Sequence, residues 1–436
     1  MLPHPISGYD DTYYSRTIDE DIAYAPLQGE VQADVCVIGG GLAGINTAFG
    51  LMQRGQKVVL LEAKRIGWGA SSRNGGFVAR GYAADHEEIA RRVGLDHARK
   101  LVNLTRDARQ LIRERAREFA IDCGPFTPGV LTVSWKDQAD DMRRYVEAAN
   151  RDFDAGLEYW PTEKVREHCK TDKYFQGFYS ADDYQFHSLR YIQGLARVMA
   201  GRGVGLHENT PAAGITKDGS NWRVKTAQGE VLARHVVLCC AMESRGLDRR
   251  IESAAFPVQT YVMVTNPLPD EDLEKTINTR HAIYDTRFTS DYYRVLPDNR
   301  IMWGGRVALW AKPHNIAAQL LKDLLKVYPQ LSGKVHPELS WYGVMCYAPH
   351  KMPQIGMIEP GYWYCTAFGG HGLVPTTVGG EAIAEAITGN TEKIGLFAPY
   401  GLSYAGGRYG RYVAQMVYWW WKARDFISLK SSMSGA

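Results

Sequence analysis

A glycine-rich turn between two short apolar runs constrains this chain of 436 residues more than any other feature. The first run covers residues 33–38 and has the length of a buried parallel strand. The turn Gly39-Gly40-Gly41-Leu42-Ala43-Gly44 follows at once, and apolar residues then recur at helical spacing. A second apolar run at residues 58–61 ends at Glu62. This order, within about thirty residues, predicts a βαβ unit that binds a dinucleotide.

Each position of this unit has a physical role in holding a pyrophosphate. Gly39 permits the tight turn, Gly41 lets the backbone approach the ligand, and Gly44 lets the helix pack against the strands. The first turn of the helix offers free N–H groups and the positive end of its dipole to the anion. Glu62 follows Gly44 by 18 residues, which is close to the spacing of an acid that binds the adenosine ribose.

The segment after the acid, residues 65–76, favours a flavin over a nicotinamide. It is small, polar and rich in glycine, so its backbone can wrap a bulky ligand while serine hydroxyls donate to phosphate oxygens. A flexible surface loop is the alternative interpretation. A second dinucleotide motif is not found in the sequence, so we expect the electrons to come from an organic substrate and not from a pyridine nucleotide.

The motifs VIGGGLAGINTA…VVLLEA and GWGASSRNGG resemble those of the D-amino-acid oxidase and glycine oxidase superfamily of FAD enzymes. The likeness is greatest to bacterial gamma-glutamylputrescine oxidoreductases and related L-pipecolate oxidases. It extends to TYYSRT near the amino end and to YYRVLPDNRIMWGG, MPQIG, FGGHGL and GGRYGR further on. The resemblance implies FAD as the cofactor, and oxidation of a C–N bond by hydride transfer to flavin N5, which gives an imine.

The resemblance also extends the set of expected cofactor contacts. It implies that backbone groups at Ala212 hold the adenine and that the turn around His371 faces the pyrimidine end of the flavin. Some members of the superfamily attach FAD through a cysteine, but Cys346 lies one residue away from that place, so we expect non-covalent FAD. The candidate contacts are Gly39, Gly41, Leu42, Ala43, Gly44, Glu62, Ala63, Gly69, Ala70, Ser71, Ser72, Asn74, Gly75, Gly76, Ala212, Gly370, His371, Gly372 and Leu373.

The pattern along the chain predicts an α/β fold with two interleaved domains. We expect a Rossmann-like FAD-binding domain and a substrate domain built on a mixed, largely antiparallel sheet, because longer aromatic-rich alternation begins at Pro257. The expected boundaries are residues 1–30 for an N-terminal arm, 31–90, 150–255 and 345–400 for the FAD-binding domain, 91–149 and 256–344 for the substrate domain, and 401–436 for an aromatic tail.

Two arginines of this second domain are candidate substrate anchors. An amino-acid carboxylate is well bound by an arginine fork, and Arg294 and Arg306 lie across a predicted hairpin, where they could converge on one face. Arg306 stands where the resembled family leads us to expect a glycine, which favours a cyclic L-amino acid such as L-pipecolate. The alternative to a substrate anchor is that both arginines face the solvent and form ion pairs with aspartates. Gamma-glutamylputrescine is the alternative substrate.

Two further residues, Tyr293 and His371, are expected to position the substrate and the flavin together with the arginines. We assign no general base, because hydride transfer from a neutral amine does not require a strong one. A structural histidine is the alternative for His371. Oxygen or a quinone is expected to accept the electrons. The strand predicted from Phe256 to Pro267 has no lysine of the kind that related oxidases often use to activate oxygen.

Composition excludes several other classes of protein. The net charge of +3 is too small to indicate nucleic-acid binding, and the seven cysteines have no zinc-ligand spacing, so we expect neither a nucleic-acid partner nor a metal. Nine Lys and Arg residues between Arg91 and Arg117 leave a flavin-dependent RNA-modification protein as a remote alternative. A solvated helix with paired charges is the simpler interpretation of that segment. A non-catalytic flavoprotein is a further alternative.

The tail is unusually aromatic between Tyr412 and Trp421, and Lys422 and Arg424 follow. This run is too short to span a bilayer, but its composition suits the headgroup interface of a membrane. A helix packed on the body of the protein is the alternative. We expect a cytoplasmic protein, since residues 1–30 have no apolar signal region. The composition of the tail adds the expectation of peripheral contact with the inner face of the membrane.

Overall fold

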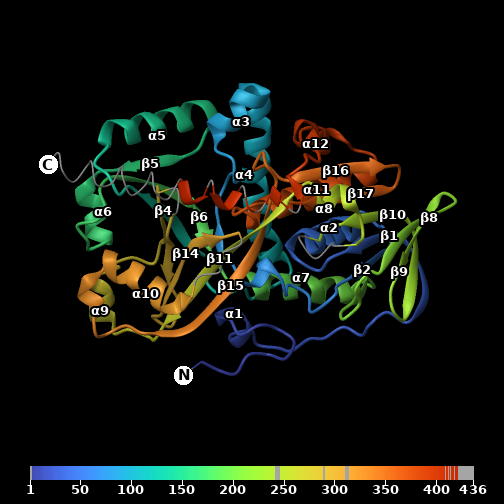
Figure 1. The fold of residues 1–436 in the computed structure, drawn as a ribbon, viewed down its shortest axis with the longest axis horizontal. Coiled ribbons are helices and arrows are strands. Elements are labelled where there is room, and N and C mark those ends of the chain that lie inside the picture. The colour runs from blue at the N-terminus through green and yellow to red at the C-terminus, as the bar shows by residue number, and fades with distance from the viewer. Residues whose placement is uncertain are drawn as a thin grey trace.

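The computed structural model describes residues 2–240, 246–287, 290–309, 314–407, 409–410, 412, 414–416 and 418–420. Two mixed β-sheets lie next to each other, and helices cover them from both sides (Figure 1). The chain crosses between the two sheets several times, so that each sheet is built from distant parts of the sequence. The predicted α/β architecture is confirmed.

The first sheet contains the predicted βαβ unit. Its strand order is β7-β2-β1-β10-β17-β16, with all neighbours parallel except β16, and the hairpin β8–β9 lies beside β10. Alternate residues of β1 and β2 enter two different cores, which explains why these strands are apolar on both faces. The strands are β1 (Gly29–Ile38), β2 (Val58–Leu61), β7 (Gly205–His207), β8 (Gly214–Asp218), β9 (Asn221–Lys225), β10 (Gly229–Leu238), β16 (Gln354–Glu359) and β17 (Tyr362–Thr366).

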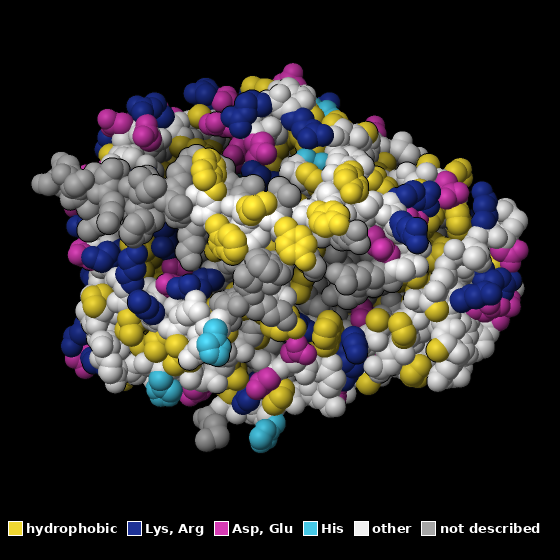
Figure 2. Space-filling view, in the orientation of Figure 1, with side chains coloured by type: hydrophobic (Ala, Val, Ile, Leu, Met, Phe, Trp, Pro, Cys, Tyr) yellow, Lys and Arg dark blue, Asp and Glu magenta, His cyan; other side chains and the backbone are white. Residues whose placement is uncertain are grey.

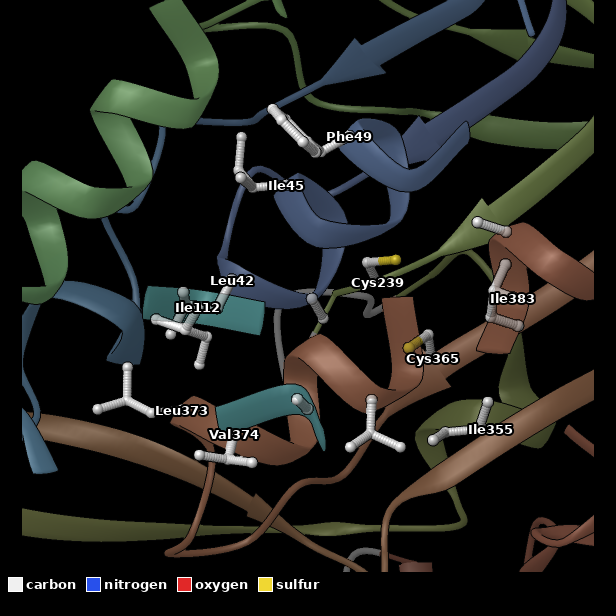
Figure 3. Close-up of a cluster of buried hydrophobic side chains, with 14 of the residues drawn as sticks. Leu42, Ile45, Phe49, Ile112, Cys239, Ile355, Cys365, Leu373, Val374 and Ile383 are labelled. Atoms are coloured by element: carbon white, nitrogen blue, oxygen red, sulfur yellow. The ribbon is translucent and has the colours of Figure 1, made fainter. Parts of the chain in front are cut away.

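Two helices of this domain pack closely on one face of the sheet. They are α2 (Leu42–Gln53) and α11 (Leu373–Ile387), and Figure 3 shows their apolar side chains in one buried cluster. A Cβ atom at Gly380 would come within 2.7 Å of the backbone of Asn46, so the helices touch there through a glycine. Both helices begin next to glycine-rich turns, which brings these two distant turns to the same end of the sheet.

The second sheet is long and largely antiparallel, as predicted. Its order is β15-β11-β14-β13-β12-β4-β6-β3, with β5 beside β6, and β12–β4 is its parallel pair. Helix α10 (Ile316–Val327) covers one face of it with Leu320, Leu324 and Val327. The strands are β3 (Phe77–Val78), β4 (Thr127–Val133), β5 (Leu157–Trp160), β6 (Gly177–Gln185), β11 (Phe256–Thr265), β12 (Ala282–Asp285), β13 (Tyr292–Val295), β14 (Ile301–Ala308) and β15 (Pro337–Tyr347).

The expected boundaries at residues 90 and 150 cut across this sheet. Strands β3, β5 and β6 belong to it, although residues 31–90 and 150–255 were expected in the FAD-binding domain. The reason is that β6 pairs with β3, β4 and β5, so it joins segments that are far apart in the sequence. Strand pairing over such distances is not visible in local periodicity.

The remaining helices lie around the sheets. The basic helix α4 uses its arginines in ion pairs: Arg109 binds Asp182 and Asp183, and Arg115 binds Glu381. The basic segment therefore neutralises acids of the body at these positions. These helices are α1 (Tyr13–Arg16), α3 (His86–Val93), α4 (Leu95–Glu118), α5 (Ala139–Phe153), α6 (Thr162–His168), α7 (Ser188–Gly201), α8 (Arg249–Glu252), α9 (Asp270–Glu274) and α12 (Glu392–Gly395), with 3-10 turns η1 (Ala70–Ser72), η3 (Pro329–Leu331) and η4 (Ala398–Tyr400).

Candidate functional site

The glycines of the first turn are required by its geometry. Gly39 has a φ of +107°, in the left-handed region, and a Cβ atom there would lie 3.1 Å from the carbonyl group of Cys239. A Cβ atom at Gly44 would overlap the carbonyl oxygen of Gly39. Gly41 is the N-cap of α2, which has no side-chain cap. The turn therefore presents bare backbone at the amino end of a helix of twelve residues, where an anion is stabilised.

The acid after β2 lies beside this turn. The Glu62 carboxylate accepts a hydrogen bond from the Gly40 N–H at 2.6 Å and another from the Lys64 N–H at 2.7 Å. Its backbone carbonyl accepts from the Thr210 N–H at 2.8 Å, which aligns the segment leading to Ala212 with the end of β2. Ala63 is exposed and Ala212 is half-buried. The acid and the proposed adenine segment are thus neighbours at one edge of the turn.

The polar loop after Glu62 folds over the same helix terminus. The Leu42 N–H donates to the Ser71 hydroxyl at 2.9 Å, so this loop touches the first residue of α2. Asn74 closes the loop, because its amide donates to the Ser71 carbonyl at 2.8 Å and its side-chain oxygen accepts from the Gly76 N–H at 2.8 Å. Gly69 and Ala70 begin the short turn η1, and Ser72, its last residue, is buried.

The second glycine turn approaches from the carboxyl end of the chain. Gly369 has a φ of +63°, and α11 begins at Leu373 with Gly372 as its N-cap. The His371 Nε2 atom lies 2.9 Å from the Ala79 carbonyl oxygen, so this nitrogen carries the proton and donates to it. Gly370 is exposed, and a Cβ atom there would overlap the Tyr347 hydroxyl. This turn therefore connects the two sheets.

These four segments fit a dinucleotide that ends in a flavin. Bare backbone at the start of α2 suits a pyrophosphate, and the Glu62 carboxylate lies next to this turn, where an acid could bind the ribose. A family model described as "FAD dependent oxidoreductase" matches residues 34–386 of the chain.

The chain belongs to this family of FAD-dependent oxidoreductases. It is 30% identical over 396 residues to the gamma-glutamylputrescine oxidoreductase of Escherichia coli K12, covering 90% of this chain and 92% of that protein. A solved glycine oxidase from Geobacillus kaustophilus superposes with a TM-score of 0.71 at 20% identity, over 85% of this chain and 98% of that one. An L-proline dehydrogenase from P. horikoshii has a TM-score of 0.69 at 20% identity, over 86% and 98% of the two chains.

The enzyme is therefore an FAD-dependent oxidoreductase. The second sheet has one face directed at the cofactor loops. A Cβ atom at Gly75 would lie 2.9 Å from the ring of Tyr292, and one at Gly76 would lie 2.8 Å from the Arg294 guanidinium. Met345 and Tyr347 of β15 approach Gly370 on the same face. A substrate between the flavin and the sheet would meet this face.

The structure does not bring the two predicted arginines together. The Arg294 guanidinium is buried, donating to the Gln185 side chain at 2.9 Å and to the Tyr14 hydroxyl at 3.0 Å. The Arg306 guanidinium binds the Asp323 carboxylate at 2.6 and 2.9 Å and the Gln319 side chain at 2.8 Å, both on α10. The expectation that they converge on one face is wrong.

A β-bulge explains the separation. The register between β11 and β14 shifts after Thr260, and Arg306 has a φ of +53°. The extra residue turns the Arg306 side chain out of the regular alternation and toward α10. The resembled family led us to expect glycine at this position. The left-handed backbone conformation found here explains that expectation, because glycine adopts it without steric cost. The arginine therefore ties the bulge to a helix of the opposite face.

Tyr293 is also on the opposite face. It is 1% exposed, its ring stacks on Trp303 at 4.3 Å between ring centroids, and its hydroxyl shares a hydrogen bond of 2.7 Å with Tyr328. These partners belong to the core under α10. The prediction that Tyr293 positions the substrate or the flavin is wrong, because the side chains of adjacent strand residues point to opposite faces.

The sequence prediction missed Tyr292, whose side chain lies on the cofactor side. Its ring lies between Gly75 and Gly304. A Cβ atom at Gly304 would overlap the ring, and one at Gly75 would come within 2.9 Å of it. Phe77 lies edge-on to it at 5.9 Å and stacks on Tyr284 at the same centroid distance. The three half-buried rings form an aromatic cluster next to the cofactor loop. Two signals in the sequence could have identified Tyr292. Side chains alternate along a strand, so Tyr292 shares the face of Arg294, and Gly304 on the partner strand leaves room for its ring.

The hydroxyls of this aromatic cluster are neutral. Burial raises the pKa of the Tyr284 hydroxyl and of the Tyr292 hydroxyl above the ordinary value for tyrosine. Apart from Arg294, the side chains on the cofactor face of β11 to β14 carry no charge. They are Phe256, Val258, Thr260, Val262, Val264, Ala282, Tyr284, Tyr292, Met302, Gly304 and Val307.

The cysteine that raised the question of covalent attachment lies away from this face. Cys346 is 7% exposed and packs among Ala255, Ala348 and Ala367. Its strand neighbours Met345 and Tyr347 are the residues that approach Gly370. Among the residues that the structure describes, no group of three His, Cys, Asp or Glu side chains could hold a metal ion.

Proposed function

We propose that the enzyme oxidises the carbon next to nitrogen in an aliphatic amine, with gamma-glutamylputrescine as the lead substrate. The observation that carries this choice is the cofactor face of β11 to β14, whose one charged side chain, Arg294, is already bound to Gln185 and Tyr14. The cofactor face of these strands therefore offers no free arginine to a carboxylate next to the reacting carbon. The relative from Escherichia coli, named for gamma-glutamylputrescine, supports the same choice at 30% identity.

We propose that the cofactor is held by the contacts predicted from the sequence and is not covalently bound. The turn from Gly39 to Gly44 and the start of α2 would bind the pyrophosphate, and Glu62 would bind the ribose. The loop around Ser71 and the turn at His371 would enclose the flavin. When bound, FAD supplies the acceptor for the hydride that leaves the substrate carbon. The protein contributes binding, orientation and the exclusion of water.

The aromatic cluster of Phe77, Tyr284 and Tyr292 would bind the amine substrate. Aromatic faces attract an ammonium group and also cover the aliphatic carbons beside it. The neutral Tyr284 and Tyr292 hydroxyls can donate hydrogen bonds without repelling an amine. The substrate must reach the flavin as a neutral amine, and an uncharged, partly buried surface favours the loss of its proton.

An anaerobic mixing experiment tests this proposal. Gamma-glutamylputrescine, L-pipecolate, L-proline and glycine are each added to the yellow enzyme without oxygen, and the flavin absorbance near its long-wavelength maximum is followed. We expect gamma-glutamylputrescine to bleach the flavin fastest. Faster bleaching by L-pipecolate would contradict the aliphatic amine and support the cyclic amino acid. Lack of bleaching by every amine would favour a non-catalytic flavoprotein.

We propose a quinone as the main electron acceptor, with oxygen as a slower one. This enzyme would then work in the cytoplasm at the inner face of the membrane. The strand β11 contributes no lysine to the cofactor face, and such a lysine would be expected to assist oxygen. Stopped-flow reoxidation of the reduced enzyme should be faster with a soluble quinone than with air-saturated buffer. Faster reoxidation by oxygen would make the enzyme an oxidase.

A further inference from the structure

The described tail residues from Gly407 to Trp420 are helical, and one side of this tail helix is tied to the second sheet. The Gln415 side-chain oxygen accepts a hydrogen bond from the Leu309 N–H at 2.8 Å. The Tyr418 hydroxyl accepts from the Val307 N–H at 3.2 Å. These donors lie at the end of β14, just beyond the Arg306 bulge. The contacts fix which side of the tail helix faces the body.

The other side of the tail helix exposes large apolar side chains. Their spacing of three or four residues places them on one side of a helix. We call them the tail stripe: Tyr409, Tyr412, Met416, Trp419 and Trp420, with exposed fractions of 61%, 37%, 58%, 47% and 58%. Figure 2 shows hydrophobic side chains gathered in the middle of this face of the molecule, over the place where the tail crosses in Figure 1.

The chemistry of the tail stripe suits the headgroup region of a membrane. Tyrosine and tryptophan have an apolar body and a polar group, and both are enriched where lipid meets water. The tail sequence adds Arg408, Arg411, Lys422 and Arg424, against the single acid Asp425 between residues 408 and 425. No described helix is long and apolar enough to cross a bilayer. Exposed aromatic side chains in a segment rich in basic residues are the composition of a helix that lies in the interface.

We infer that the tail stripe docks the enzyme on a lipid surface that carries anionic headgroups. The positive charge of the tail selects the anionic surface, and the aromatic rings enter the interface. A second copy of this chain would also bury apolar groups, but it would not call for the basic residues in the tail sequence. The inference deepens the proposed function, because a docked enzyme can reach a quinone dissolved in the membrane.

Vesicle flotation tests the inference without substrate or turnover, so its outcome is separate from that of the proposed amine oxidation. The complete chain with bound FAD is mixed with vesicles of phosphatidylcholine and phosphatidylglycerol, or of phosphatidylcholine alone, and centrifuged. We expect recovery with the anionic vesicles at low salt and much less with the neutral ones. The variant M416S/W419S/W420S should lose flotation by about tenfold or more, because three interfacial side chains are removed together.

A matched variant separates the tail stripe from exposed apolar groups in general. Tyr145 and Met357 are 40% and 49% exposed on other elements, so the Y145S/M357S enzyme should float like the original chain. Retained yellow colour and an unchanged elution volume show that each variant is folded. Equal flotation of the triple variant would overturn the inference, as would absence of flotation by the complete chain. A lipid-free dimer that the triple variant abolishes, without flotation, would assign the stripe to a contact between copies.

Discussion

The Tyr14 hydroxyl accepts a hydrogen bond of 3.0 Å from the Arg294 guanidinium directly against Gly76. A Cβ atom at Gly76 would lie 2.8 Å from both groups, and Gly76 has a φ of +77°. The short helix α1 of the N-terminal arm thus reaches the cofactor loop through the interior of the protein. This contact explains why Tyr14 of the N-terminal arm is buried. It also indicates that Arg294 positions the cofactor loop and does not contact the substrate.

Removal of this hydroxyl should weaken the binding of FAD. Without it, a buried N–H of Arg294 loses its acceptor, and the loop that carries Asn74 and Gly76 becomes less well held. We expect Tyr14→Phe to cost about 1 kcal/mol of cofactor binding, or about a fivefold rise in Kd. Titration of the apoprotein with FAD measures this. Tyr13→Phe, on the same helix, leaves the Tyr14–Arg294 bond intact and should bind FAD as before. Equal affinities for all three proteins would show that Tyr14 does not position the loop.

Tyr292 should affect substrate binding more than folding if the aromatic cluster contacts the amine. Tyr292→Phe keeps the ring that lies between Gly75 and Gly304 and should change the KM for an amine about threefold or less, as expected for one exposed-side hydrogen bond. Tyr292→Ala removes the ring and should raise the KM about tenfold or more through lost aromatic and cation–π contact. Steady-state kinetics with FAD in excess measures both. A loss of kcat at constant KM would contradict a binding role.

The comparison of Tyr292 with Tyr293 shows which property of this strand the sequence could not predict. The strand itself was predicted, and so was its place in a substrate domain, because alternation is a local signal. The prediction chose both Tyr293 and Arg294, although neighbours on a strand point to opposite faces. Which face meets the cofactor depends on the pairing of β13 with β14, and a shift by one residue exchanges the two faces.

The first glycine turn was predictable because its geometry does not depend on long-range strand pairing. Gly39, Gly44 and Glu62 lie within one βαβ unit, so their spacing in the sequence determines where they lie in space. Arg306 was misjudged because a bulge sets its direction, and the bulge arises from the register with β11. The tail was only partly predictable: its packed side contacts β14 through Gln415 and Tyr418, as the simpler alternative expected, while the other side stays exposed.

Arg306 should stabilise the fold without selecting the substrate. Its ion pair with Asp323 is partly buried, with side-chain exposures of 26% and 23%, so we expect Arg306→Met to lower the free energy of unfolding by about 1 kcal/mol. The KM for an amino acid and for its decarboxylated amine should change by the same factor, because the guanidinium faces α10. Paired kinetic measurements test this. A selective rise of the KM for the carboxylate compound would restore Arg306 as a substrate anchor.

A half-buried histidine should make the stability of the enzyme fall in mild acid. The His86 ring packs against Phe153 with 4.8 Å between ring centroids, and burial first and the nearby Arg80 second lower its pKa to about 4. Because this folded-state pKa lies below the ordinary value of about 6.5, the contribution of the neutral ring is complete above pH 6.5. It is lost as the pH falls from there through 4, since only the unfolded chain takes up the proton readily.

We expect about 2 kcal/mol of stability to depend on His86 over this interval, as a shift of this size implies after allowance for partial exposure. Urea unfolding of the FAD-bound enzyme at pH 7 and near pH 4 measures the difference. His86→Gln, which stays neutral, should flatten the pH dependence by about that amount. The remaining dependence should include His187, whose pKa burial also lowers. His336→Gln replaces an exposed histidine and should leave the profile unchanged. Identical profiles for the original chain and His86→Gln would show that His86 becomes protonated without cost in the folded protein.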